Sequence, residues 1–316
     1  MKILIELPTW LGDTVMVTPA IENIISHCNE PEITIIGSFV SIEVLKNHPK
    51  VVKAEVLQKN YISLYKIVKN LNQFDVYFSF RSSFRSRISK LLISSKKKYQ
   101  FERNKYQNCH QVEKYNDFVN DVLGTNFPAR KLVLQAINST LSTHNLKLGI
   151  NPGASYGEAK RWYPEEFAEV AAELSEKYDI IIFGGLGEVD IANDIEKSLI
   201  EKGVTNYQNL AGKTTIPELI NQISRLDLFI TGDSGPMHIA ATFQIPTVAI
   251  FGPTKDNETS QWMNKKSIIV KKNLECQPCM KRTCPLAHHN CMRLIKAIDV
   301  LTVIKSFDSK SGVSLK

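Results

Sequence analysis

Hydrophobic residues along this chain gather in short apolar runs, and the segments between the runs repeat apolar residues at helical spacing. In the first half the runs are KILIEL (2–7), ITIIG (33–37), KAEVL (53–57) and DVYFSF (75–80). The intervening segments place apolar residues three or four positions apart, as at Val17, Ile21 and Ile24. Apolar strands that alternate with amphipathic helices are typical of βαβ units around a parallel sheet. The pattern therefore predicts a doubly wound α/β domain in this half.

The same alternation starts again in the second half, after a polar segment. Residues 124–145 gather Pro, Asn, Ser and Thr around one apolar stretch, so we place the domain boundary at the end of this segment. The later apolar runs are KLGIN (147–151), DIIIFGG (179–185), DLFITGD (227–233) and PTVAIFG (246–252). Residues 1–145 and 146–316 are thus predicted to form two α/β domains. In such sheets ligands bind beyond the carboxyl ends of the strands, so function is expected in the loops that directly follow them.

The composition agrees with two folded domains and excludes several other classes of protein. The 316 residues are 43% hydrophobic and 22% charged, which fits neither wholesale disorder nor collagen-like repeats. No apolar window reaches the roughly 18 residues that a spanning helix needs. The first apolar run is broken by Glu6 and Pro8 and lacks the features of a signal peptide. We expect a cytoplasmic protein whose contact with any membrane is peripheral.

The loop after the first predicted strand, PTWLGDTVMVTPAI, contains the first candidate for chemistry. Gly12 allows a sharp turn of the backbone, and Asp13 comes directly before a helix that is predicted to begin near Thr14. As a structural residue, Asp13 would be an ordinary N-cap that accepts the first amides of that helix. As a functional residue, it would be a general base that takes a proton from an incoming hydroxyl. The residues alone leave both interpretations open.

Two adjacent cations follow small residues in the loop NPGASYGEAKRWYPEEF (151–167). Lys160 and Arg161 come shortly after Gly153 and Ser155. Turn amides and an ammonium group suit a diphosphate, because both neutralise negative charge on a leaving group. A solvated basic loop is the alternative interpretation.

A predicted helix N-terminus is the third candidate, in TGDSGPMHIAATF (231–243). Asp233 and Ser234 are common helix caps, and Gly235 leaves room at the same point. The free amides and the positive end of the helix would bind a phosphate without a further cation. His238 lies one helical turn after Ser234, where it would either face the same cleft or be a buried structural histidine.

A dinucleotide-binding fingerprint is incomplete in GGLGEVD (184–190), which follows a strand and opens a helix. Gly185 and Gly187 occupy the first two glycine positions, but Asp190 stands where a third small residue would allow close packing. An NAD-dependent oxidoreductase is therefore an alternative from another class of enzyme.

Four cysteines lie within a short segment near the C-terminus, at Cys276, Cys279, Cys284 and Cys291. Their spacing would close a tetrahedral zinc site. Reduced thiols that pack an irregular loop are the alternative, which we favour.

Positive charge is concentrated between residues 81 and 105. The chain carries a formal net charge of +7, and this stretch has nine Lys and Arg residues against Glu102 alone, a local excess of +8. Interleaved aromatic residues such as Phe84 and Tyr99 would allow binding of nucleic acid, in which rings stack on bases. An anionic membrane surface would attract the same cations, and part of the run could be a solvated face.

Taken together, four segments resemble the lipopolysaccharide heptosyltransferases, family 9 of the glycosyltransferases. The segments are Gly12-Asp13 after the first strand, KRWYP (160–164), NLAGKTT (209–215) and GDSGPMH (232–238). The resemblance covers essentially the whole chain, and the CxPC…C…HHxC stretch is typical of type II members of the family.

The resemblance implies a GT-B fold, in which two Rossmann-like domains face one another across a cleft. The first domain would hold the acceptor and the second would hold ADP-heptose, with a final helix at 299–307 that packs back on the first domain. The reaction would be an inverting transfer of heptose from ADP-L-glycero-D-manno-heptose to the inner core of lipopolysaccharide or lipooligosaccharide. No cofactor would be required, and zinc would be dispensable.

The resemblance also implies roles for individual residues. Asp13 would be the catalytic base. The donor-binding residues would be Thr9, Gly12, Ser155, Lys160, Glu188, Thr214, Thr215, Asp233, Ser234, Gly235 and His238. Arg81, Arg85 and His110 would bind the acceptor, a lipid-linked acidic core oligosaccharide at the cytoplasmic face of the inner membrane. Nucleic acid is not an expected partner, and a sugar-nucleotide epimerase is an alternative enzyme that would share the donor site.

Overall fold

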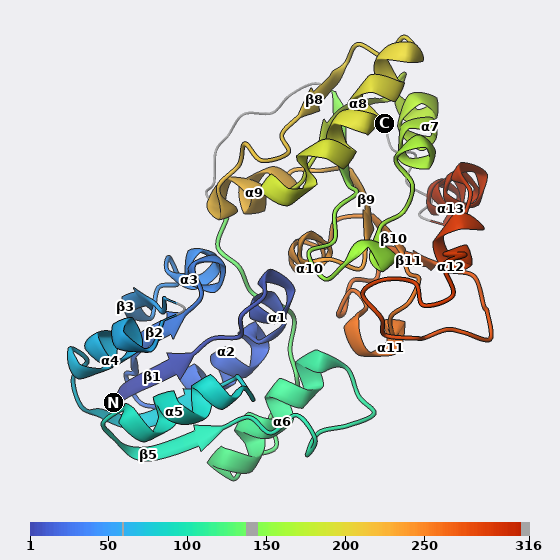
Figure 1. Cartoon of the computed structure of the whole chain (residues 1–316). Coiled ribbons are helices and arrows are strands. Elements are labelled where there is room, and N and C mark those ends of the chain that lie inside the picture. The colour runs from blue at the N-terminus through green and yellow to red at the C-terminus, as the bar shows by residue number, and fades with distance from the viewer. Residues whose placement is uncertain (59, 137–144, 311–316) are drawn as a thin grey trace. The chain divides into compact units, whose positions relative to one another are not determined.

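The computed structural model of the protein describes residues 1–58, 60–136 and 145–310 (Figure 1). The chain divides into two compact units, Met1–Gln135 and Ala136–Lys316. The predicted boundary lies between residues 145 and 146, so the two divisions differ over a segment of which 137–144 lie outside the described residues. Within the described ranges, no helix has the length and apolar character needed to cross a bilayer.

A five-stranded parallel sheet forms the centre of the first unit, in the order β3-β2-β1-β4-β5. Its strands are β1 (Lys2–Glu6), β2 (Glu32–Gly37), β3 (Val51–Val56), β4 (Phe74–Ser79) and β5 (Ser95–Gln100). Its helices are α1 (Leu11–Met16), α2 (Thr18–His27), α3 (Phe39–Leu45), α4 (Tyr61–Lys69), α5 (Phe84–Leu92) and α6 (Gln111–Leu123). The four apolar runs therefore form strands of this sheet, as predicted. β1, β2 and β4 are largely buried, whereas β3 lies at an edge of the sheet and has no buried residue.

Alternate residues of the central strands serve opposite faces of this sheet. Leu4 and Tyr77 join the core under α4 and α5, whereas Phe78 points to the other face and packs edge-on against Phe118 of α6 at 6.3 Å. Helices α2 and α6 also pack against each other. Both faces of the sheet are thus covered, which is the doubly wound arrangement.

A six-stranded parallel sheet forms the centre of the second unit, in the order β11-β10-β9-β6-β7-β8. Its strands are β6 (Leu146–Asn151), β7 (Tyr178–Ile182), β8 (Tyr207–Asn209), β9 (Leu228–Gly232), β10 (Thr247–Ile250) and β11 (Ser267–Val270). Its helical elements are η1 (Glu158–Lys160), α7 (Pro164–Leu174), η2 (Leu186–Glu188), α8 (Val189–Glu201), α9 (Ile216–Ile223), α10 (Gly235–Thr242), α11 (Asp256–Thr259), α12 (Asn290–Arg293) and α13 (Ala297–Lys310). A second doubly wound domain is therefore present, as predicted.

The final helix α13 packs within the second unit, against α7, β10 and β11. Glu166 of α7 ties its start, because this carboxylate accepts the Ala297 N–H at 2.7 Å and pairs with Lys296 at 2.7 Å. The predicted helix at 299–307 is thus present, and its predicted return to the first domain stays a prediction.

Candidate functional site

In each sheet the chain adds strands on one side of its first strand and then on the other, which creates a topological switch point. The loops with the predicted site residues follow the two strands that flank this point. In the first sheet the switch lies between β1 and β4, which are followed by the Asp13 loop and by Arg81. In the second sheet it lies between β6 and β9, which are followed by the Lys160 loop and by Asp233. The crevice beyond such a switch point is where open α/β sheets bind their ligands.

A buried ion pair joins the two loops of the second unit. Lys160 Nζ lies 2.5 Å from Asp233 Oδ2 and 3.3 Å from the Asp233 carbonyl oxygen. The side chains of Lys160 and Asp233 are 12% and 5% exposed, so water screens the pair only weakly. Thr254 donates a further hydrogen bond to the same Asp233 oxygen at 2.7 Å. The two predicted donor-binding residues are therefore held together at the carboxyl edge of the sheet.

Ser234 stands at the N-cap position of α10, but its side chain does not cap the helix. Its hydroxyl instead lies 3.2 Å from the Asn151 amide and 3.0 Å from the Thr231 hydroxyl. The start of α10 therefore offers the N–H groups of Ser234 and Gly235 near the Lys160 ammonium group, since Pro236 has no N–H and the Met237 N–H donates to the Ser234 carbonyl oxygen at 3.2 Å. This combination of amides and a cation suits a phosphate.

Glu188 reaches the same group of loops from the start of α8. Its Oε2 accepts the Gly185 N–H at 2.8 Å, and its carboxylate lies directly against Gly153. A Cβ atom at Gly153 would lie 2.0 Å from the Glu188 carboxyl carbon, so a larger residue there would displace this side chain. The incomplete fingerprint at 184–190 thus serves to place a carboxylate beside the loop that follows β6.

Trp162 anchors the KRW segment in the core. It is 1% exposed, its indole N–H donates to the Ile295 carbonyl at 2.9 Å, and its ring meets Phe167 edge-on at 4.8 Å. Because Trp162 is fixed two residues after Lys160, the ammonium group has a defined position at the edge of the sheet.

The other residues that were predicted to bind the donor lie in several different elements of the fold. Thr215 is the N-cap of α9 in a capping box with Glu218, and its hydroxyl donates to that carboxylate at 2.8 Å. His238 is buried in α10, and Ser155 is exposed. The remaining residues of the set lie in the loop before α9 (Thr214) and in the first unit (Thr9 and Gly12). Their contacts with a donor stay predictions.

Asp13 lies in the first turn of α1 and is not its N-cap. The helix begins at Leu11 after Trp10, so the predicted start near Thr14 and the capping interpretation are wrong. The Tyr115 hydroxyl of α6 donates a hydrogen bond to the Asp13 carboxylate. Burial raises the pKa of Tyr115 well above its usual value, and the negative charge of Asp13 raises it further. Tyr115 therefore stays protonated and holds the carboxylate in place.

Arg81 is paired with a carboxylate that the sequence analysis did not single out. Glu6, at the end of β1, is 1% exposed and accepts hydrogen bonds from Tyr77 and Ser79, each at 2.6 Å. Arg81 Nη1 lies 3.6 Å from its other oxygen. A buried carboxylate thus fixes the cation that follows β4.

The two other predicted acceptor residues also have structural partners. Arg85 on α5 donates to the Gln58 carbonyl oxygen. His110 is buried at the N-cap of α6, where its Nδ1 accepts the Val112 N–H at 3.2 Å. Contacts of these residues with an acceptor stay predictions.

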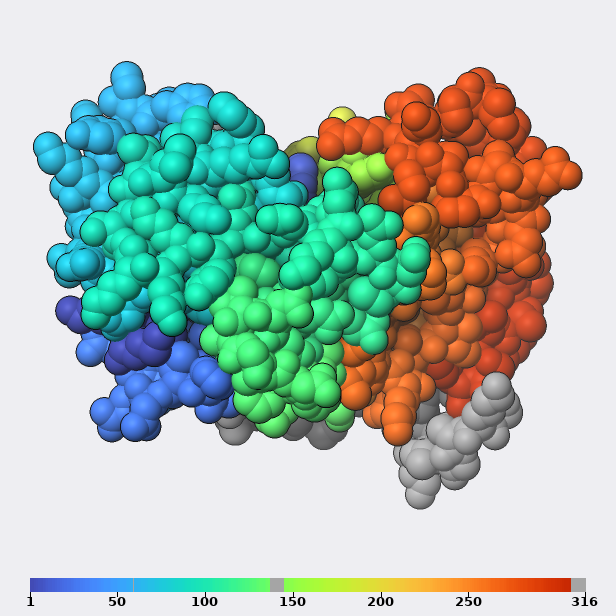
Figure 2. All heavy atoms as spheres, turned by 90° about the horizontal axis from the view of Figure 1, so that it is seen from below, coloured from blue at the N-terminus to red at the C-terminus, as the bar shows by residue number. Residues whose placement is uncertain are grey.

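Only part of the basic stretch is paired with acids. Lys96 pairs with Asp75 and Lys105 pairs with Asp121, each at 2.7 Å. Figure 2 shows the stretch within the teal surface of the first unit. Three of its lysines lie on β5, an edge strand of the sheet, where charge discourages pairing with another chain.

The first three of the four cysteines lie on a long loop between β11 and α12, and Cys291 lies in α12 itself (Figure 1). All are free thiols, and Cys291 is the buried one. Burial, together with the nearby thiols of Cys279, Cys284 and Cys276, raises the pKa of Cys291 to about 11. Among the described residues, no group of three or more His, Cys, Asp or Glu side chains is placed to hold a metal ion. The structure of the described residues therefore does not support the alternative that the cysteines bind zinc.

This cysteine loop, residues 271–289, packs on the loop that follows β6 and contains Lys160. The Ala159 N–H donates to the Arg282 carbonyl oxygen at 3.0 Å, and the Tyr156 hydroxyl donates to the Met280 carbonyl oxygen at 2.8 Å. The His289 Nε2 lies 3.0 Å from the Ala159 carbonyl oxygen. Sequence analysis missed this contact, because no local pattern links residues so far apart in the chain.

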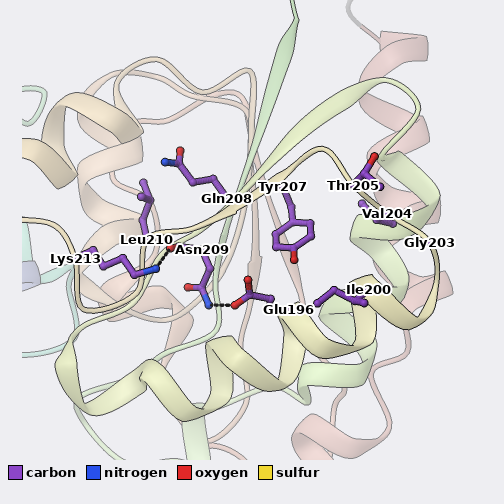
Figure 3. Close-up of a pocket in the computed structure, with 10 residues that line it drawn as sticks. All are labelled: Glu196, Ile200, Gly203, Val204, Thr205, Tyr207, Gln208, Asn209, Leu210 and Lys213. Carbon is purple, nitrogen blue, oxygen red and sulfur yellow. Dashed lines mark hydrogen bonds between the residues drawn. The ribbon is translucent and has the colours of Figure 1, made fainter.

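A groove of about 630 Å³ lies along the edge strand β8, away from these contacts (Figure 3). Two of its polar side chains are bonded within the groove: Asn209 donates to Glu196 at 2.7 Å, and Lys213 donates to the Asn209 carbonyl oxygen at 3.0 Å. None of the predicted site residues lines this groove. The chemistry is therefore expected at the switch points.

Comparisons with known proteins find similar heptosyltransferases, and the relatives and solved structures match almost the whole chain. The family model described as glycosyltransferase family 9 (heptosyltransferase) matches residues 76–290. Lipooligosaccharide heptosyltransferase 2 of Campylobacter jejuni is 43% identical, over 97% of this chain and 98% of that protein. The structure of Escherichia coli ADP-heptose lps heptosyltransferase II has a TM-score of 0.81 at 20% identity, covering 99% of this chain and all of that one. The E. coli heptosyltransferase WaaC with ADP has a TM-score of 0.74 at 14% identity, covering 97% and 100%.

Two doubly wound domains give the chain the GT-B fold, which it shares with the structure of E. coli heptosyltransferase II. The chain belongs to glycosyltransferase family 9, the heptosyltransferases. The predicted class of enzyme is thereby confirmed, and the oxidoreductase and epimerase alternatives are excluded.

Proposed function

We propose that the protein transfers heptose from ADP-L-glycero-D-manno-heptose to the inner core of lipooligosaccharide or lipopolysaccharide, with inversion at the anomeric carbon. The observation that carries this proposal is the pairing of Lys160 with Asp233 beside the start of α10, which makes a site for a diphosphate. The names of relatives that match over nearly their full length support the heptose and the core acceptor.

The donor would bind at the switch point of the second unit. Its diphosphate would meet the Lys160 ammonium group and the N–H groups at Ser234 and Gly235. Both stabilise the negative charge that ADP gains when the bond between the anomeric carbon and its phosphate oxygen breaks. Glu188, a hydrogen-bond acceptor next to Gly153, would receive the ribose hydroxyls.

The acceptor hydroxyl would be activated in the first unit. As its oxygen attacks the anomeric carbon, Asp13 takes the hydroxyl proton while ADP departs from the opposite side. A single displacement needs one base and no enzyme nucleophile, and it inverts the anomeric configuration. Tyr115 orients the base through its hydrogen bond.

Transfer by the purified protein to a core acceptor that lacks the heptose tests this proposal. We expect ADP-heptose, offered beside UDP-glucose, GDP-mannose and NAD, to raise the mass of the acceptor by one heptose. NMR of the product should show the anomeric configuration opposite to that of the donor. Transfer from another sugar nucleotide alone, or retention of configuration, would refute the proposal.

We assign acceptor binding to Arg81 and Arg85, whose charges would meet phosphates and carboxylates of the core. Arg85→Glu should raise the KM for the acceptor about tenfold, because it replaces an attraction by a repulsion, and should leave the KM for the donor unchanged. Initial-rate kinetics with each substrate varied would measure both constants. Lys197→Glu, at an exposed position of α8 in the second unit, is the control. Equal changes in both KM values would refute an acceptor role for Arg85.

We place the enzyme at the cytoplasmic face of the inner membrane, held by the outer faces of α4 and α5. Six large apolar side chains are exposed there beside Lys66, Lys69, Arg87 and Lys90: Tyr61, Ile62, Tyr65, Phe84, Leu91 and Leu92. Phe84, Arg87 and Leu91 share one helical face by their spacing. Exposed apolar residues interleaved with cations are typical of helices that bind an anionic membrane surface.

Sedimentation with lipid vesicles tests this membrane face. The double variant Phe84→Ser and Leu91→Ser should bind vesicles of phosphatidylcholine and phosphatidylglycerol about tenfold more weakly, because two apolar side chains no longer enter the lipid. The double variant Leu186→Ser and Ile200→Ser, at exposed positions of the second unit, is the control. If both variants sediment like the unaltered protein, the membrane lies elsewhere.

A further inference from the structure

The ring of Tyr156, in the loop that follows β6, lies close to two cations from distant parts of the chain. Lys160 Nζ lies 4.7 Å from the centroid of the Tyr156 ring, and the Arg282 guanidinium carbon lies 5.5 Å from the same centroid. Because both distances are measured to one point, the two cations cannot be farther apart than these distances together. Arg282 belongs to the cysteine loop, more than a hundred residues after Lys160.

The backbone holds Arg282 at this position through several contacts. The Ala159 N–H donates to the Arg282 carbonyl oxygen at 3.0 Å, and the Tyr156 hydroxyl donates to the Met280 carbonyl oxygen at 2.8 Å. A Cβ atom at Gly157 would lie only 2.5 Å from the Arg282 carbonyl oxygen, so glycine there allows the close approach of the two loops. The placement of Arg282 is thus built into both loops.

Lys160 and Arg282 differ in whether an acidic side chain pairs with them. Asp233 neutralises Lys160 at 2.5 Å. Across the part of the chain that the structure describes, no acidic side chain forms an ion pair with Arg282. An anion at the loop that follows β6 would therefore find in Arg282 a positive charge that is not already paired, and a planar fork of N–H donors that fits phosphate oxygens.

We infer that Arg282 is a second phosphate-binding cation of the donor site, delivered by the cysteine loop. This inference rests on the proposed function, because it takes the diphosphate of the donor as the anion at this loop. Lys160 and Arg282 would both bind the diphosphate, and the Tyr156 ring would position both cations through cation–π contacts. Cys276, Cys279 and Cys284 then belong to a loop that presents Arg282.

Binding measurements by calorimetry on the full-length protein test the inference. Arg282→Gln should weaken binding of ADP and of inorganic pyrophosphate about tenfold, since a charged hydrogen bond is lost. Binding of adenosine should be unchanged, because it has no phosphate. Arg282→Lys should recover part of the loss, which a merely structural role of the side chain would not predict. Lys281→Gln, at the neighbouring exposed residue, should bind ADP like the unaltered protein.

The outcomes separate this inference from the proposed function. If the unaltered protein binds neither ADP nor pyrophosphate, the proposed donor site fails, and the inference fails with it. If the unaltered protein binds ADP and Arg282→Gln binds it equally well, only the inference is overturned. A loss that is the same for adenosine and ADP would also overturn it, because that result would mean general damage to the loop.

Discussion

Replacing Asp13 by Asn should lower kcat about a thousandfold while leaving the Kd for ADP nearly unchanged. Asn keeps the shape of the side chain but cannot take the proton from the acceptor hydroxyl, and loss of a general base typically costs this much. The donor site should be intact because Lys160, Asp233 and Ser234 belong to the other unit of the chain. Single-turnover kinetics and calorimetry with ADP would measure the two quantities.

A matched variant separates loss of the base from loss of charge. Asp117 is an exposed acid of the same unit on α6, and Asp117→Asn should transfer heptose at the normal rate. If Asp13→Asn keeps near-normal turnover, Asp13 is not the base. If Asp13→Asn loses ADP binding together with turnover, the assignment of the two roles to separate units is wrong.

Replacing Lys160 by Met should weaken ADP binding at least tenfold and should also destabilise the protein by about 3 kcal/mol. Both effects have one origin. Asp233 is 5% exposed, so without Lys160 its charge stays buried with only the Thr254 hydroxyl beside it. The same uncompensated carboxylate would repel the phosphates of the donor. Urea unfolding and calorimetry with ADP would measure the two effects.

The double variant Lys160→Met and Asp233→Asn separates the effect on ADP binding from the effect on stability. Removing both charges should restore most of the free energy of unfolding, because no buried charge is left unpaired. ADP binding should stay weak, because the cation is still missing. Recovery of ADP binding in the double variant would show that Lys160 acts on stability alone.

Most of the fold follows from the apolar runs. The eight predicted strands are all present, and seven of them are largely buried apolar segments with clear ends. The exception is β3, an edge strand without a buried residue. The strands β5, β8 and β11 were not predicted. β5 reads SKKKYQ and lies at an edge of the sheet, where lysines face solvent and the apolar signal is lost. β8 and β11 are short strands at the ends of their sheet order.

The start of α1 shows the limit of reasoning from capping residues. Asp13 and Thr14 resemble an N-terminus, yet the helix begins at Leu11 without a side-chain cap. The Thr14 hydroxyl instead donates to the Trp10 carbonyl oxygen at 2.8 Å, one turn back. Packing of the buried Val15 and Met16 therefore outweighs the local preference.

The site was predictable where it follows the ends of strands, and unpredictable where it depends on distant contacts. Lys160 and Asp233 were each predicted to follow an apolar strand and to belong to one donor site, and the structure shows that these strands, β6 and β9, are adjacent and parallel. The contacts Tyr115–Asp13 and Arg282–Tyr156 join residues about a hundred positions or more apart, and no motif within either segment announces them. Only the folded backbone brings these pairs together.

A crystal structure of the protein with ADP is the most direct test of the central claim that the switch point of the second unit binds a diphosphate. We expect phosphate oxygens within hydrogen-bond distance of Lys160 Nζ and of the backbone N–H groups of Ser234 and Gly235 at the start of α10. A nucleotide bound in the groove along β8, or in the first unit, would contradict it.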